Sequence, residues 1–369
     1  PSSHRKYSRA VEMPMLKRVW SRRHTVDAFG GLNRGARIGD GEFSRMENLC
    51  ADFYPALGPR PGRVQTEIRN VTALGAGEGL CYTQGKYLVL PDRQVDLGLT
   101  EEGPKKLVTM GAYVLVFPDK KYASTVDPSD FGALEACFPG DTPVTMTPCS
   151  LEGADRVPGF VQPTEPWEPG NKALWLDTSS SPQVLKEWSA ASGLWVTVQT
   201  AYVRLSAPGI GKDFRVYDGV TVKGAGDLDG GNALWQVTED SLVISGVLGR
   251  KTTVERGLRV LRQVPDMDFV TECGNRLWGC RFGPGAEGKA VNELYASKLG
   301  DFKNWNCFMG LSTDSYTVGV GSQGPFTGAV TYLGTPIFFK EDCLYKVYGS
   351  YPGAFRVQST VCPGGLHYC

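Results

Sequence analysis

Histidine is scarce in this chain, with only three among 369 residues, at positions 4, 24 and 367. Nucleophilic triads and most general-base schemes use histidine. The long stretch between His24 and His367 therefore lacks the usual base for such chemistry. Ten cysteines are present, but no two form a Cys-x-x-Cys pair. Because structural zinc sites use closely spaced ligand pairs, we expect no metal, no cofactor and no enzymatic activity.

Long apolar runs and net charge are missing as well. No run approaches the roughly 20 residues that a membrane span needs, so the sequence predicts no membrane span. The 39 Lys and Arg residues balance 39 Asp and Glu residues, which leaves no bulk attraction for nucleic acid. The basic start has no apolar stretch behind it, so we expect no secretory signal. Five of the ten cysteines, Cys50, Cys81, Cys273, Cys280 and Cys343, mostly stand in or beside apolar runs. This indicates reduced, structural thiols and assembly in a reducing cytoplasm.

Glycine and proline, in contrast, are abundant, with 46 and 24 residues. Turn-forming residues at this frequency favour many short strands over long helices. One plan occurs at 269–297 and again at 329–348: apolar run, glycine turn, apolar run, polar turn, and a third run with an aromatic. Weaker copies start at 107 and 82. In each copy, the glycine before the middle strand is expected in a tight turn with positive φ. These turn glycines are Gly85, Gly111, Gly274 and Gly334.

The fold class predicted from these repeats is mainly β, with propeller-like meanders and an inserted small β lobe. The spacing of the repeats and the composition of the intervening segments predict the domain boundaries. We expect a basic N-terminal arm at 1–25, the first part of the propeller-like body at 26–138, a Pro/Gly-rich linker at 139–165, inserted small β modules at 166–255, and the second part of the body at 256–369.

The basic arm has two interpretations. It could dock on carboxylates of a neighbouring subunit, or it could contact the phosphates of nucleic acid. Without aromatic residues among its charges, subunit contact is favoured. The residues expected to make such contacts are Arg5, Lys6, Arg9, Lys17, Arg18, Arg22 and Arg23.

Aromatic and acidic residues offer two further alternatives. Trp175, Trp188 and Trp195 could stack on a sugar ring, although a Trp in a small β module is more often part of its core. Propeller glycosidases would need clustered carboxylates. The candidates are Asp130, Asp301, Asp314 and Asp342, which are more simply explained as turn and strand-end residues.

The segment 292–305, Asn-Glu-Leu-Tyr-Ala-Ser-Lys-Leu-Gly-Asp-Phe-Lys-Asn-Trp, resembles propeller segments of tailed-bacteriophage virion proteins. The family is that of packaged-DNA stabilisation, tail nozzle and hub proteins. Residues 40–62, with Asp-Gly-Glu-Phe, Asn-Leu and Pro-Arg-Pro-Gly steps, are similar to the N-terminal strand of that family. The segments 174–195 and 218–244 resemble small modules of phage tail and fibre proteins.

The resemblance implies a structural virion protein, assembled in the host cytoplasm and placed in the tail. Its partners would be portal, adaptor or tail subunits and further copies of itself in a homo-oligomeric ring, with non-specific contact to packaged DNA. Relatives continue past residue 361 with further blades, so we expect a ring that is open or completed by another subunit. The alternatives are a carbohydrate-contacting adhesion component of the tail and a propeller glycosidase.

Overall fold

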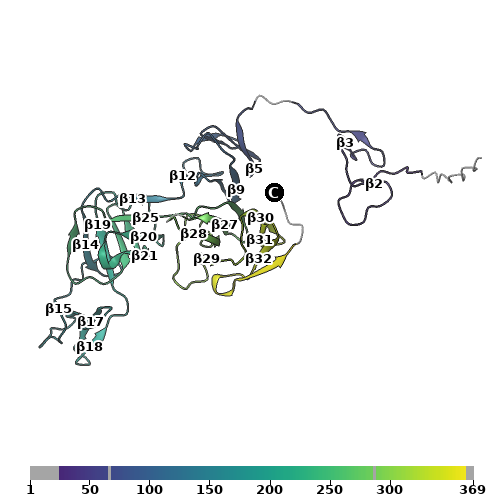
Figure 1. The fold of residues 1–369 in the computed structure, drawn as a ribbon. Helices are drawn as coiled ribbons and strands as arrows, with labels where there is room; N and C mark the ends of the chain where they lie inside the picture. Colours follow the sequence, from purple (N-terminus) through teal and green to yellow (C-terminus); the bar gives the residue numbers. More distant parts are fainter. Residues whose placement is uncertain (1–24, 65–67, 286–287, 363–369) are drawn as a thin grey trace, which may run out of the picture. The chain divides into compact units, whose positions relative to one another are not determined.

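The computed structural model describes residues 25–64, 68–285 and 288–362. The basic arm, with all seven of its candidate contact residues, lies outside these ranges. The chain divides into two compact units, residues 1–67 and 68–369, and Figure 1 shows their strands. In the described part of the chain the helices are two short 3₁₀ turns, η1 (Gly226–Leu228) and η2 (Pro352–Ala354). None of its helices has the length and apolar character needed to cross a bilayer.

The first unit is built from two-residue strands. β1 (Gly31–Leu32) pairs in parallel with β2 (Glu42–Phe43), and β3 (Leu49–Cys50) pairs antiparallel with β4 (Gly58–Pro59). Residues 26–66 were expected in the propeller-like body, but they belong to this separate unit. The physical reason is that they offer no apolar alternation from which a sheet face could be built.

The second unit contains four antiparallel meanders, each of four strands in simple sequential order. The first meander is β5 (Val71–Ala76), β6 (Leu80–Gln84), β7 (Tyr87–Val89) and β8 (Gln94–Asp96). The second is β9 (Lys106–Met110), β10 (Tyr113–Phe117), β11 (Lys121–Ser124) and β12 (Phe131–Ala133). The third is β26 (Phe269–Glu272), β27 (Leu277–Pro284), β28 (Ala290–Ala296) and β29 (Tyr316–Gly319). The fourth is β30 (Phe326–Tyr332), β31 (Thr335–Lys340), β32 (Cys343–Tyr348) and β33 (Arg356–Val361). The chain is thus mainly β, with many small antiparallel sheets, as the sequence predicted.

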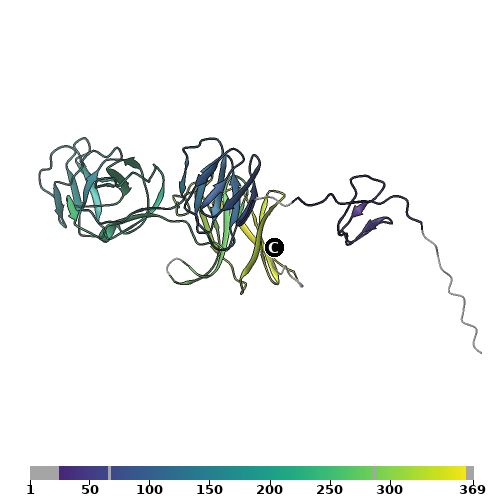
Figure 2. The same ribbon diagram turned by 90° about the horizontal axis from the view of Figure 1, so that it is seen from above.

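The meanders stack face to face in chain order. Their first strands are neighbours in series, β5 with β9, β9 with β26, and β26 with β30. Figure 2 shows the blue, green and yellow sheets of the meanders next to one another. Side chains along β10 alternate between the two faces of the second meander. Val114 and Val116 pack into the core shared with the first meander, while Leu115 and Phe117 pack into the core shared with the third. A third apolar core lies between the third and fourth meanders.

The inserted lobe lies between β12 and β26 in the sequence and consists of two sheets around one apolar core. One sheet has the order β13 (Ala136–Phe138), β25 (Arg259–Arg262), β20 (Gly219–Lys223) and β21 (Gly230–Ala233). The other has the order β22 (Gln236–Thr238), β23 (Ser241–Ser245), β19 (Tyr202–Ser206), β14 (Val144–Cys149) and β24 (Thr252–Val254). A smaller sheet emerges between β14 and β19. It is formed by β15 (Phe160–Gln162), β16 (Leu174–Asp177), β17 (Val184–Ser189) and β18 (Leu194–Thr197).

The strands of the lobe therefore run from 136 to 262, beyond the expected 166–255, and the expected linker 139–165 contains β14 and β15. The prediction of a linker was wrong because it rested on the proline content of this segment. Pro148 lies within β14, where it pairs with Val203 of β19. On the other side of β14, the pairing with β24 ends at Met146. Residues 155–156 follow there with an isolated bridge, in which the Pro148 carbonyl oxygen accepts from the Arg156 backbone N–H at 2.8 Å. The missing N–H of Pro148 therefore falls outside a continuous ladder, where it is tolerated.

Candidate functional site

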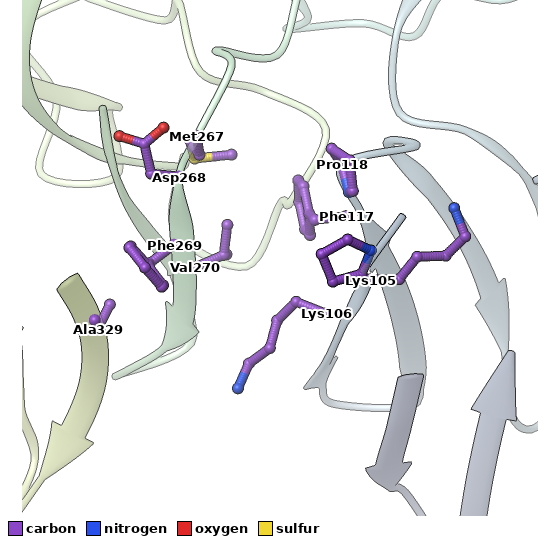
Figure 3. A pocket seen from close by; sticks show the side chains of 11 residues that line it. Lys105, Lys106, Phe117, Pro118, Met267, Asp268, Phe269, Val270 and Ala329 are labelled. Carbon is purple, nitrogen blue, oxygen red and sulfur yellow. The ribbon is translucent and has the colours of Figure 1, made fainter. Parts of the chain in front are cut away.

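A cavity of about 470 Å³ lies beside the first strands of the second, third and fourth meanders. Figure 3 shows Phe117 and Phe269 on opposite sides of it, with Lys106 extending between them. Two other charged lining residues are already neutralised: Lys105 pairs with Asp119 at 2.6 Å, and Asp268 pairs with Arg281 at 2.6 Å. This first cavity is therefore mainly apolar, and Lys106 is the one charged lining residue without an ion pair in the described part of the chain.

A second cavity, of about 400 Å³, is polar. It is lined by the end of the second meander, by the loop 212–215 of the lobe, by Arg262 of β25, and by Lys303 from the loop after β28. Its basic side chains are Lys212, Arg215, Arg262 and Lys303, and its acidic ones are Glu135 and Asp213. We call it the cationic cavity, because the bases outnumber the acids.

Lys303 is the most unusual group in the cationic cavity. Its Nζ donates to the Tyr122 hydroxyl at 2.8 Å and lies 4.0 Å from the centre of that ring. The hydroxyl in turn donates to Asp130 at 2.8 Å, and Tyr113 donates to the same carboxylate at 3.0 Å. Desolvation lowers the pKa of Lys303 to about 8, and the charges of Arg215 and Arg262 act in the same direction.

Burial also acts on Tyr122, whose pKa it raises to about 12 together with the hydrogen bond to Asp130. The hydroxyl is therefore neutral near pH 7, and it accepts from Lys303 without supplying a compensating charge.

A buried polar cluster fixes the lobe against this region. Asp218 accepts from Arg262 at 2.5 Å and from Asn304 at 2.9 Å, and Asn304 also donates to Asp301 at 2.6 Å. The backbone N–H of Gly219 donates to Asn304 Oδ1 at 2.8 Å. A Cβ at Gly219 would lie 2.7 Å from the Asn306 carbonyl oxygen, so this approach requires glycine. These contacts set the position of the 212–218 loop relative to Lys303.

All four turn glycines identified from the sequence have positive φ, between 54° and 71°. Gly111, Gly274 and Gly334 lie between the first and second strands of their meanders. Gly85 lies between β6 and β7, one strand later, so the weakest copy was aligned one strand out of step.

The three tryptophans pack mainly on one another. Trp175 and Trp188 each meet Trp195 edge to face, with ring centres 5.4 Å and 5.5 Å apart. Trp175 is only 4 % exposed, and Lys186 Nζ lies 4.5 Å from the centre of its ring. Since a sugar needs an open aromatic face, Trp175 cannot provide the stacking surface that was considered for it.

The four candidate carboxylates serve loops and turns. Asp130 holds two tyrosine hydroxyls, and Asp301 accepts from the backbone N–H of Lys303 at 2.9 Å. Asp314 accepts from the backbone N–H groups of Met309 and Leu311. Asp342 is exposed beside the turn before β32. Among the described residues, no group of three or more metal-ligating side chains is present, and the nine cysteines there are free thiols.

Sequence reasoning missed the cationic cavity. Lys303 lies inside the segment that carried the family resemblance, but its partners Tyr122, Arg215 and Arg262 are distant in sequence. No local pattern connects them. The chain matches no protein-family model and no curated protein.

Proposed function

We propose that this chain is a structural component of a tailed-phage particle, a hub-like or nozzle-like tail subunit whose meanders form part of a propeller-like ring. The family resemblance of residues 292–305 and 40–62 motivates the virion assignment. The architecture supports the assembly role, because four stacked four-stranded meanders are the building units of a propeller.

The observation that carries the proposal is that both ends of the stack present apolar side chains that no described residue covers. On the first meander, Leu74 and Leu80 are 67 % and 61 % exposed, on the face opposite Cys81. On the fourth, Val330 and Tyr332 are 43 % and 62 % exposed. Exposed apolar groups gathered on one face are typical of interaction sites.

The two uncovered faces correspond to opposite sides of the repeated sheet. The first meander exposes the side that, in the second and third meanders, packs against the preceding sheet. The fourth exposes the side that elsewhere packs against the following sheet. The fourth meander of one copy can therefore continue the stack onto the first meander of another, which is a head-to-tail interface that closes into a ring when the rotation permits.

The experiment is to measure the mass of the purified full chain in solution and to image it by electron microscopy. We expect an oligomer with a central opening. Leu74→Glu should dissociate it, since a carboxylate buried in an apolar interface costs several kcal/mol. The matched control is Leu194→Glu, because Leu194 is 63 % exposed on the small sheet of the lobe, away from both end faces. A wild-type chain that stays monomeric at high concentration would overturn the proposed ring.

A further inference from the structure

The cationic cavity has an ammonium group with unused donors. An ammonium carries three N–H donors, and Lys303 donates one of them, to the neutral Tyr122 hydroxyl. Asp130, the carboxylate behind that hydroxyl, already accepts from two tyrosines. Within the described ranges the other Lys303 donors have no hydrogen-bond partner, so they are available to a ligand in the cavity.

The acidic groups at the cavity do not supply the missing counter-charge. Glu135 pairs with Lys120 at 2.9 Å, and Asp218, below the cavity, is engaged by Arg262. Asp213 is exposed, so solvent screens the charge of its carboxylate. Arg215 lines the same cavity and is exposed at its surface. An anion placed between Arg215 and Lys303 would gain charge-assisted hydrogen bonds from both.

We propose that the cationic cavity binds a small ligand through one carboxylate or phosphate group, with Lys303 and Arg215 as the anion-contacting residues. Tyr122 and Phe214, which also line the cavity, flank the anion and provide apolar surface for the body of the ligand. This site goes beyond the assembly role and does not depend on it, since no residue of it lies on either end face.

Calorimetric titration of the full chain at low salt tests the site, with inorganic phosphate and glucuronate as separate probes. Stronger binding of phosphate would identify a phosphorylated ligand, and stronger binding of glucuronate an acidic sugar; both support the site. We expect Lys303→Gln and Arg215→Gln each to weaken binding about tenfold. Lys251→Gln, which changes an exposed lysine outside the cavity, should leave the affinity unchanged.

The pH dependence gives a second readout that a purely structural role for Lys303 would not produce. Tyr122, Asp130, Asp301, Arg215 and Arg262 surround the amine electrostatically, and its pKa is lowered to about 8. Glucuronate does not titrate in this range, so its affinity should fall as pH rises from about 7 to about 9, and Lys303→Gln should remove that fall.

Two results would overturn the site. One is the absence of saturable binding of either probe below about 10 mM. The other is binding that both variants retain at full strength, because the anion would then sit elsewhere. Arg215→Gln keeps the second of these results interpretable even if Lys303→Gln fails to fold, since the exposed Arg215 side chain can be replaced without disturbing the fold.

Discussion

Gly274 shows how much one residue contributes when its role is conformational. Its φ is +63°, its neighbour Asn275 has φ +59°, and no atom lies within 4 Å of where a Cβ would stand. A side chain at Gly274 would therefore meet no steric clash, and its free-energy cost would come only from the strained backbone conformation. We expect Gly274→Val to lower the free energy of unfolding by about 1–3 kcal/mol, measured by denaturant titration.

Two controls separate backbone strain from the loss of glycine itself. Gly274→Asn should cost much less than Gly274→Val, because asparagine tolerates the left-handed region. Gly321 has equally open surroundings but no positive φ, so Gly321→Val should have little effect. Equal losses at Gly274 and Gly321 would contradict the turn argument.

At the scale of elements, Lys340 ties the fourth meander to the third. Its side chain is 1 % exposed, and Nζ donates at 2.8 Å to Asn292 Oδ1 of β28 and to the carbonyl oxygens of Ser322 and Gly324. Phe282 and Phe326 place their rings within 4.9 Å of the ammonium. One side chain thereby closes the loop between β29 and β30.

Replacing Lys340 with methionine keeps the volume but removes one donor from each of these three acceptors, of which the Ser322 oxygen keeps Asn292 Nδ2 as a second donor at 2.6 Å. We expect Lys340→Met to destabilise the chain by about 2–4 kcal/mol in denaturant titration, since buried polar groups that lose a partner are costly. The control is Lys346→Met, on the neighbouring strand β32, where the half-buried lysine points to the uncovered face. If Lys340→Met lowers the free energy of unfolding no more than Lys346→Met does, the hydrogen bonds of Lys340 contribute nothing to stability.

The meanders illustrate which elements a sequence can reveal. The hairpins around Gly111, Gly274 and Gly334 were identified because tight turns and apolar strands leave local signals. The fourth strands were missed: β8 and β12 have only three residues, and β33 is largely exposed and polar, so no buried face is repeated in their sequence. The cationic cavity was missed for a different reason. Tyr122, Arg215, Arg262 and Lys303 meet only through sheet packing, which has no local pattern.

The whole molecule is built by nested insertion. The lobe interrupts the series of meanders between β12 and β26, and the small sheet β15–β18 interrupts the lobe between β14 and β19. Cys149 at the end of β14 is the register partner of Tyr202 at the start of β19. The two ends of this inner insertion therefore lie one hairpin turn apart, and an Asn-Gly turn can join them directly.

We expect that replacing residues 150–201 with Asn-Gly leaves the lobe and the four meanders folded. The deletion removes the ion pair of Arg204 with Asp155 and uncovers Val247, which packs against the small sheet. These are partly exposed contacts, so the melting temperature should fall by only about 2–4 °C, followed by circular dichroism.

A partial deletion provides the contrast. Removing only residues 184–197 deletes β17 and β18 but keeps β16, whose Leu174 and Trp175 would then lose the strand that covers them. Exposing two large core side chains costs several kcal/mol, so this smaller deletion should be the more harmful one. If instead removal of 150–201 unfolds the lobe while the partial deletion is tolerated, the small sheet is a part of the lobe's folding unit, and the nested arrangement does not describe its energetics.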